Sequence, residues 1–182
     1  MKSIIEGERA LCFWLSQQTE VSLNHPDEQV KQEASDYVSL MTPVVKSLFT
    51  DLAMEITSDA MQIHGGYGFT KDQGIEQLYR DNRITPIYEG TNSFQAADLV
   101  FRKLSNKNGN IIKKFLEMVK SEGDSKNDKV KSYSKELNYY LDILYKFTGW
   151  IEDKTKIEKD DVSAAANDYL KTLGYVSIAY SW

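Results

Sequence analysis

Three short motifs decide how this chain is interpreted: Gln-Ile-His-Gly-Gly-Tyr-Gly-Phe at residues 62–69, Tyr-Arg-Asp at 79–81 and Ile-Tyr-Glu-Gly-Thr-Asn at 87–92. The glycines of the first motif predict the end of a helix, because glycine takes the positive φ angles that close a helix C-terminus. They also let another group approach the backbone closely. The second motif predicts a short helix that ends on a charged pair.

The third motif places one acid, Glu89, just before a predicted helix start. Thr91 and Asn92 are good capping residues, and Gln95 is placed to return a hydrogen bond from the first turn. The free N–H groups and the positive dipole end of such a start favour a phosphate. These residues alone predict a loop with an anion site and one carboxylate.

Upstream of the motifs, apolar residues recur every three or four positions over residues 45–63. This period predicts a long and well-buried helix. Because proline interrupts a helix interior, we expect Thr42 to cap this helix and Pro43 to be its first residue.

Shorter helices are predicted on both sides of this long helix. A first helix covers about residues 3–18, and Pro26 is expected in the first turn of the second. Beyond the long helix, Thr70 and Gln73 have the spacing of a capping box, which predicts a helix start there.

Two side-chain arrangements follow from these helices. We expect Arg80 and Asp81 to form a partly buried ion pair that fixes the loop carrying Glu89. On the helix after this loop, four apolar residues are expected to face one way: Phe94, Ala97, Phe101 and Leu104.

The remainder of the chain also predicts helices. Apolar spacing marks three of them, at residues 112–119, 130–151 and 162–176. A polar linker at 105–109 and a solvated loop at 121–128 separate them, and residues 175–182 have an alternative interpretation as a strand.

The predicted fold class is therefore all-α. The expected organisation is a helical bundle over residues 1–104 with an appended helical extension over residues 105–182. A single cysteine, Cys12, excludes an internal disulfide and favours a reducing compartment, so a cytoplasmic location is expected.

Composition excludes several classes of function. A net charge of −5 gives no electrostatic case for binding nucleic acid or an anionic membrane. The two histidines, His25 and His64, have no cysteine partner nearby, so no metal site is predicted. No apolar run approaches 18 residues, so no membrane span is predicted.

Taken with their neighbours, the motifs resemble the C-terminal signature of the flavin-dependent acyl-CoA dehydrogenases. In that family a Gln-x-x-Gly-Gly-x-Gly turn is followed by Arg-Asp and then by Tyr-Glu-Gly-Thr. The resemblance extends upstream to Thr-Pro-Val-Val-Lys at 42–46 and downstream through Phe-Gln-Ala-Ala-Asp-Leu at 94–99 to residues 102–104. The rest of the chain is similar to the helical extension of a longer subgroup, which includes enzymes similar to 3-methylthiopropanoyl-CoA dehydrogenase.

The resemblance implies roles for individual residues. Glu89 would be the base that takes a proton from the α-carbon of an acyl thioester, with its own N–H as one donor to the thioester oxygen. Gly90 would lie against the acyl-CoA substrate. Contacts with FAD are implied for eight residues: Gln62, Ile63, His64, Gly65, Gly66, Thr91, Asn92 and Ser93. Those of the glycine turn are to the adenosine-diphosphate half of an FAD bound mainly by a neighbouring subunit.

The resemblance also implies partners. They are an acyl-CoA substrate, further copies of the chain or the family's N-terminal domains, and an electron acceptor such as electron-transferring flavoprotein. Because those domains supply most of a flavin site, the chain alone is expected to be inactive and colourless. The alternative is a non-catalytic helical association module that retains the signature.

Overall fold

The computed structural model describes residues 1–104, 109–123 and 128–181, and within these ranges it contains helices and no strand. The all-α prediction is confirmed. The α-helices are α1 (Lys2–Asn24), α2 (Glu28–Ile63), α3 (Gly66–Phe69), α4 (Ile75–Asn82), α5 (Asn92–Asp98), α6 (Gly109–Gly123), α7 (Asp128–Lys154) and α8 (Lys159–Tyr180). A 3₁₀ turn, η1 (Lys71–Gln73), precedes α4, and a π-helical turn, η2 (Leu99–Lys103), continues α5.

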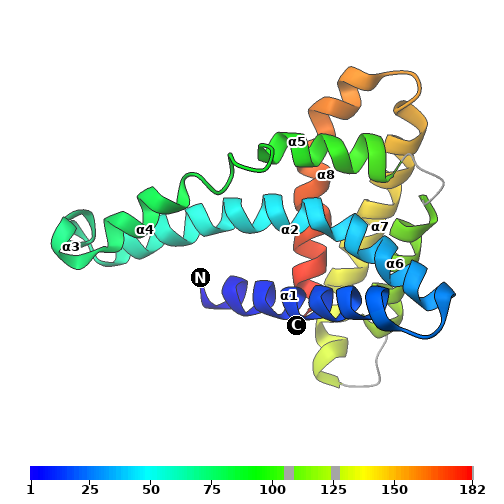
Figure 1. Ribbon diagram of the computed structural model, residues 1–182, viewed down its shortest axis with the longest axis horizontal. Helices are drawn as coiled ribbons and strands as arrows, with labels where there is room; N and C mark the ends of the chain where they lie inside the picture. The colour runs from blue at the N-terminus through cyan, green and yellow to red at the C-terminus, as the bar shows by residue number, and fades with distance from the viewer. Residues whose placement is uncertain (105–108, 124–127, 182) are drawn as a thin grey trace.

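Helix α2 is the element around which the others are arranged (Figure 1). Its first half, residues 28–52, lies among α1, α5, α6 and α8, and α7 packs on α6 and α8; we call this part the bundle. Its second half projects away from the bundle with α3 and α4 against it, and we call residues 53–82 the arm. The buried residues of α2 end at Leu52, so only the first half of the helix contributes to the core.

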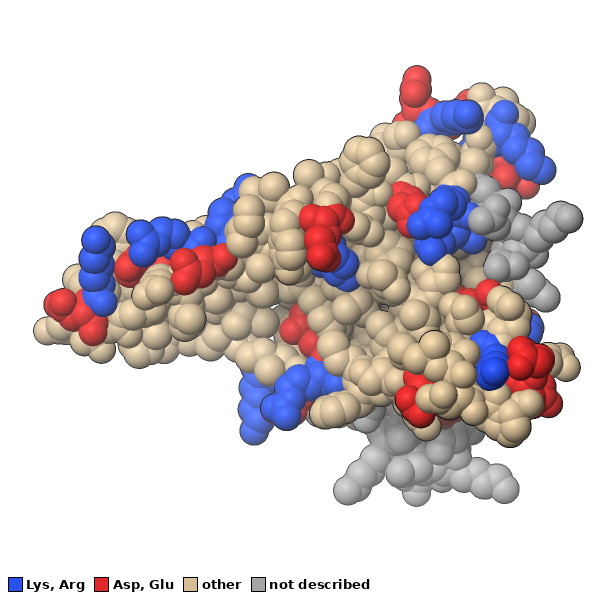
Figure 2. Space-filling view, in the orientation of Figure 1, with Lys and Arg blue, Asp and Glu red and all other residues tan. Residues whose placement is uncertain are grey.

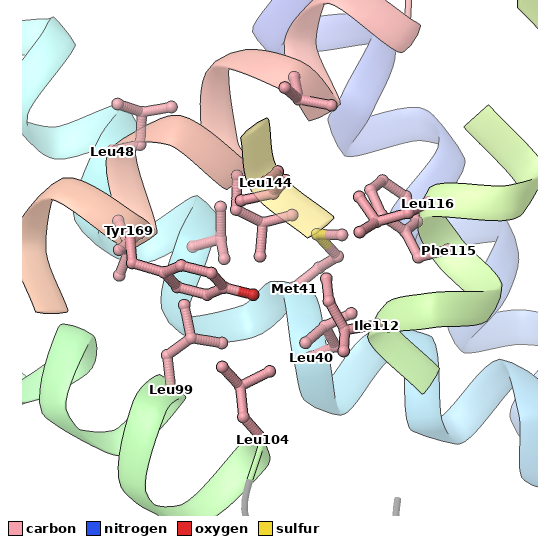
Figure 3. Close-up of a cluster of buried hydrophobic side chains, with 14 of the residues drawn as sticks. Leu40, Met41, Leu48, Leu99, Leu104, Ile112, Phe115, Leu116, Leu144 and Tyr169 are labelled. Carbon is pink, nitrogen blue, oxygen red and sulfur yellow. The ribbon is translucent and has the colours of Figure 1, made fainter. Parts of the chain in front are cut away.

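The core of the bundle is formed by side chains from α2, η2, α6, α7 and α8 (Figure 3). Tyr169 lies fully inside it, and its hydroxyl group shares a 2.8 Å hydrogen bond with Thr148 Oγ1. Helices α8 and α2 approach closely at Gly174, where a β-carbon would collide with Leu48 and lie 3.2 Å from Val44 Cγ1. The packing of α8 on α2 therefore depends on the absence of a side chain at this position.

The start of the chain differs in detail from the prediction. Helix α1 continues to Asn24, six residues beyond its expected end at 18. Asp27 caps α2 by accepting hydrogen bonds from the N–H groups of Gln29 and Val30. Pro26 thus precedes the cap instead of lying in the first turn of the helix.

The predicted helix start at Thr42 and Pro43 is wrong, because α2 runs through both residues. Thr42 does not cap a helix; its hydroxyl group donates back to the carbonyl of Val38 at 2.6 Å. Pro43 costs the helix one backbone hydrogen bond. Its side chain is buried beside Val44 in the core, and this packing offsets the loss.

The predicted capping box at Thr70 is also wrong. Thr70 makes no capping bond, and its hydroxyl group donates to the carbonyl of Tyr67 at 2.9 Å. Gly74, with φ of +71°, separates η1 from α4, so the expected single helix is two short pieces. On α5 and η2, Leu104 is buried but Phe94 is 74% exposed, so the four predicted residues do not share one face.

The three predicted C-terminal helices are confirmed as α6, α7 and α8. Residues 175–180 continue α8, so their interpretation as a strand is wrong. Of the loop expected at 121–128, residues 121–123 belong to α6 and Asp128 begins α7, and residues 124–127 lie outside the described residues. Of the linker predicted at 105–109, residues 105–108 lie outside the described residues.

Core side chains from both sides of residue 104 belong to one hydrophobic cluster, which joins Leu48 of α2 to Ile112 of α6 and Tyr169 of α8. The division into units at 1–104 and 105–182 stays a prediction.

Candidate functional site

The loop between α4 and α5 carries the predicted base in an unusual backbone conformation. Glu89 has φ of +54° and is the only non-glycine residue with positive φ in the described part of the chain. Gly90 follows with φ of +86°. The left-handed region is costly for a residue with a side chain, and such residues are often found at functional sites.

Two side chains hold this loop by its carbonyl groups. Lys46 of α2 donates from Nζ to the Gly90 carbonyl oxygen at 2.7 Å. Gln95 of α5 donates from Nε2 to the Glu89 carbonyl oxygen at 2.9 Å. Gln95 therefore does return a hydrogen bond from the start of the helix, but it bonds a carbonyl of the preceding loop instead of an N–H group of the cap.

Asn92 connects the loop to α2. Its Nδ2 donates to the Ser47 carbonyl, to Thr50 Oγ1 and to Asp51 Oδ1, at 3.1, 2.9 and 2.7 Å. Its Oδ1 accepts from Lys46 Nζ at 2.8 Å. The amide group of Asn92 is thus turned toward α2, and its predicted contact with a cofactor stays a prediction.

The N–H groups of the loop face the other way. In a trans peptide the N–H and C=O bonds point in opposite directions, and the described residues contain no cis peptide. With the carbonyls of Glu89 and Gly90 held toward Gln95 and Lys46, the N–H of Gly90 is directed away from Gln95 and the N–H of Thr91 away from Lys46. Neither these groups nor the N–H of Glu89 has a hydrogen-bond partner among the described residues.

The surroundings of the loop are open and partly apolar. The side chain of Glu89 is exposed, as are those of Tyr88 and Phe94 on either side of it. Thr91 caps α5 by accepting a hydrogen bond from the Phe94 N–H at 3.4 Å, which confirms the predicted cap, and Ser93 is exposed in the first turn.

The glycine turn lies at the tip of the arm. α2 ends at Ile63, and Gly65 has φ of +59°, as predicted for a helix closed by glycine. A β-carbon at Gly68 would come within 2.5 Å of the Met61 carbonyl oxygen, so this glycine is required by the turn itself. Gly65 and Gly66 have open space on the side where a β-carbon would lie. The five predicted cofactor contacts of this turn are all exposed: Gln62, Ile63, His64, Gly65 and Gly66.

The glycine turn and the Glu89 loop lie far apart in this chain (Figure 1). Asn92 contacts Thr50, and Gly65 follows Thr50 by 15 residues along one continuous helix. At a rise of 1.5 Å per residue this is a separation of roughly 20 Å. The structure therefore places the predicted site residues in two separate groups, one on the bundle and one on the arm.

The predicted ion pair between Arg80 and Asp81 is wrong. Arg80 instead pairs with Glu76 at 3.8 Å, and Asp81 accepts a hydrogen bond from Gln77 Nε2 at 3.3 Å. Side chains four residues apart are neighbours on a helix, whereas consecutive ones point in different directions. Arg80 and Asp81 are exposed on the arm and do not hold the Glu89 loop.

Lys46 lies at the Glu89 loop, and no role was predicted for it from the sequence. It lies within the Thr-Pro-Val-Val-Lys stretch that carries part of the family resemblance, but it precedes the loop by 44 positions. Only the folded chain brings it to Gly90.

The described residues show neither a metal centre nor a membrane span. Within residues 1–104, 109–123 and 128–181, no cluster of His, Cys, Asp and Glu side chains could hold a metal ion. Across the same part of the chain, every helix is too short or too polar to cross a bilayer. The face seen in Figure 2 carries Lys and Arg interspersed with Asp and Glu, with large uncharged areas between them.

Comparisons with known proteins identify relatives of both the sequence and the fold. Residues 23–104 match the family model for the acyl-CoA dehydrogenase C-terminal domain. The chain is 40% identical over 123 residues to the 3-methylmercaptopropionyl-CoA dehydrogenase of Ruegeria pomeroyi, covering 65% of this chain and 20% of that protein. It is 34% identical over 115 residues to a butyryl-CoA dehydrogenase of Syntrophomonas wolfei, covering 63% and 19%.

A solved structure shares the fold across the whole chain. Caenorhabditis elegans ACDH-11 in complex with C11-CoA superposes with a TM-score of 0.85 at 22% identity, covering 100% of this chain and 30% of that one. The chain spans about a fifth of the length of the curated relatives named above.

Proposed function

We propose that the chain is the part of an FAD-dependent acyl-CoA dehydrogenase that carries the catalytic base, Glu89, because residues 23–104 match the family model for the acyl-CoA dehydrogenase C-terminal domain. One observation carries the proposal. Glu89 sits in a strained loop whose carbonyls accept hydrogen bonds from Lys46 and Gln95, and whose N–H groups at 89, 90 and 91 have no partner among the described residues. This is an arrangement suited to a carbonyl or phosphate oxygen beside a base.

The proposed reaction is the α,β-dehydrogenation of an acyl-CoA thioester. The Glu89 carboxylate takes the α-proton, and its own unpaired N–H donates to the thioester oxygen, on which negative charge develops as that proton leaves. FAD, when bound, supplies the acceptor for the β-hydrogen as hydride. Gly90 takes the left-handed backbone, with φ of +86°, that carries the chain from Glu89 to the start of α5, and by the family resemblance it would lie against the substrate.

The chain's own residues fit such a cofactor at two places. Near Glu89, unpaired N–H groups and the exposed rings of Tyr88 and Phe94 offer polar and apolar contacts. On the arm, the open backbone at Gly65 and Gly66 allows close approach by another group. Their separation of roughly 20 Å supports the assignment of residues 62–66 to a flavin held mainly by a neighbouring subunit, and of residues 91–93 to one nearer Glu89.

Association with other domains or copies follows from the surface of the arm. Apolar side chains are exposed along it and into the Glu89 loop: Ile63, Tyr67, Phe69, Leu78, Tyr79, Ile84, Ile87 and Tyr88. Clusters of exposed apolar residues mark interaction sites. We propose a homo-oligomer or a complex with the family's N-terminal domains, in the cytoplasm, with electron-transferring flavoprotein as an electron acceptor.

The same surface favours a second candidate function. A helical association module would also expose an apolar arm, and it would need no reactive acid. The two functions differ in whether Glu89 touches a substrate, so this carboxylate is the group to test.

The test is acyl-CoA oxidation, followed with an artificial electron acceptor, by the chain joined to the family's N-terminal domains. Glu89→Gln should lower the turnover number by about 10²–10⁴-fold, because an amide cannot accept the proton. Glu55→Gln, which changes an exposed acid on α2, is the matched control and should retain activity.

The flavin absorbance of the same preparations separates the two functions. We expect the isolated chain to be colourless and the joined protein to be yellow, with or without the Glu89→Gln change. Normal turnover by the Glu89→Gln variant would contradict the role of the base. A yellow joined protein that oxidises no acyl-CoA would favour the association module.

A further inference from the structure

We propose that Lys46 is a positioning residue that fixes the backbone of the Glu89 loop, and with it the direction of the loop's N–H groups. The inference rests on the proposed function of Glu89. It starts from two contacts: Lys46 Nζ lies 2.7 Å from the Gly90 carbonyl oxygen and 2.8 Å from Asn92 Oδ1.

The ammonium group of Lys46 is committed to these neutral oxygens. Among the described residues it forms no ion pair, although acids are nearby on α2 and Asp51 accepts from Asn92 in the same network. A hydrogen bond from a charged donor is roughly twice as strong as a neutral one. Lys46 is thus the charged donor that ties the carbonyl of Gly90 to the bundle, and the bond from Asn92 to the Asp51 carboxylate supports the same connection.

The bond from Lys46 acts on a defined peptide unit. The Gly90 carbonyl and the Thr91 N–H belong to the same planar group, so drawing the carbonyl toward α2 turns the N–H outward. A charged donor at the carbonyl also polarises the peptide and makes that N–H a better donor. Gln95, which is uncharged, orients the peptide between Glu89 and Gly90 in the same way: it binds the Glu89 carbonyl and so turns the Gly90 N–H to the opposite side.

Lys46 is itself held by the rigid part of α2. Its neighbours Ser47 and Leu48 are buried in the bundle, and its own side chain is half-buried. The position of the Glu89 loop is therefore fixed by the core of the bundle and not by the arm. Lys46 makes no contact with the carboxylate of Glu89, so it acts through the backbone.

The first test measures the loop without catalysis. In Lys46→Met, which keeps an apolar stem and removes the charge, the amide hydrogens of Ile87, Tyr88 and Asn92 should exchange faster with solvent. These are the amides whose bonds to Ile84 and Pro86 shape the loop. Lys46→Arg keeps a charged donor and should restore part of the protection.

Lys31→Met is the matched control. Lys31 is another half-buried lysine of α2, but it pairs with Glu28 in the first turn of the helix. Its loss should leave exchange at 87–92 unchanged. Urea unfolding of all three variants shows whether each is folded, and a folded Lys46→Met with unchanged exchange at 87–92 would overturn the proposal.

The second test uses the joined, flavin-loaded protein. Lys46→Met should lower the turnover number by at least 10-fold with a smaller change in KM and normal flavin content, because a base displaced by about 1 Å is costly to the rate. Lys46→Arg should recover part of the loss. Equal turnover by Lys46→Met and wild type would overturn the role in positioning the base. Failure of Glu89→Gln to slow the reaction would instead contradict the proposed function, and the exchange test would still report on the loop.

Discussion

The two halves of α2 show how one helix can be stable for two different reasons. Residues 28–52 include Leu40, Met41, Val44 and Leu48, each 1% exposed or less. The arm half contains no buried residue and ends at Ile63, which is 70% exposed. Both halves have apolar residues at helical spacing, yet only the first has residues that are buried in this chain.

The difference shows that the spacing of apolar residues identifies the face of a helix that is suited to burial. The spacing does not identify the partner that buries this face. In the bundle the partners of α2 are α1, α5, α6 and α8. On the arm, α3 and α4 cover part of α2 but leave large apolar side chains such as Tyr67, Phe69 and Leu78 in solvent. The proposed site at Gly65 lies on the uncovered half, and Glu89 is tied to the covered half through Lys46.

Truncating one leucine or isoleucine in each half should give the largest contrast. Leu48→Ala should lower the free energy of unfolding by about 2–5 kcal/mol, because it empties a fully packed position. Ile63→Ala should change it by less than about 0.5 kcal/mol in the isolated chain. Urea denaturation followed by circular dichroism measures both free energies of unfolding. Similar losses of stability in the two variants would contradict the difference between the two halves of α2.

A pair of glycines sharpens the same comparison within the bundle. Gly174→Ala should lower the free energy of unfolding by about 1–3 kcal/mol, since the new methyl group collides with Leu48. Gly149→Ala on α7 meets nothing within 4 Å and should raise stability by about 0.5–1 kcal/mol. Thermal unfolding of the two variants should shift in opposite directions; a shift of both in the same direction would contradict the close approach of α8 to α2.

A change at Glu8, near the junction of the two halves of α2, should have a smaller effect on the free energy of unfolding, and this effect should depend on pH. Burial raises the pKa of Glu8 to about 7, and its Oε1 has no hydrogen-bond partner in the described part of the chain. Nearby, burial and the charges of Glu55, Asp51 and Glu8 raise the pKa of Tyr175, so acids from α1 and α2 gather around α8.

Because the folded chain holds the Glu8 proton more tightly than the unfolded chain, stability should fall as pH rises from about 4.5 toward 7. Glu8→Gln should therefore stabilise the chain at pH 8, on the order of 1 kcal/mol after solvent screening, and have little effect at pH 4. The control Glu6→Gln changes an exposed acid on α1 and should show no such difference. Urea denaturation at both pH values measures the change in the free energy of unfolding. An equal effect of Glu8→Gln at pH 4 and pH 8 would contradict the raised pKa of Glu8.

The sequence predicted the elements that depend on local rules. The helix ends at 63–65 and the Thr91 cap follow from glycine and hydroxyl chemistry near each position, and both are confirmed. The three C-terminal helices are confirmed because their apolar residues have partners inside the chain. The site residues around Glu89 stay predictions that rest on the family resemblance.

The failures occurred where distant packing overrides a local rule. Pro43 lies inside α2 because the core accepts its side chain, and Phe94 points outward because Ala96, Leu99 and Val100 provide the buried face instead. Arg80 and Asp81 are adjacent in sequence but point apart on α4. The contact of Lys46 with Gly90 spans 44 positions, and no pattern within a short window reports it.

The left-handed backbone at Glu89 has a consequence for how the chain can change over time. Glycine would occupy that conformation without strain, so selection for stability alone would favour losing the acid. An acid persists at such a position only if something other than folding rewards it. In a copy of this chain that no longer needs the proposed base, residue 89 should therefore be the first to change. Lys46 and Gln95, which hold the loop, could remain.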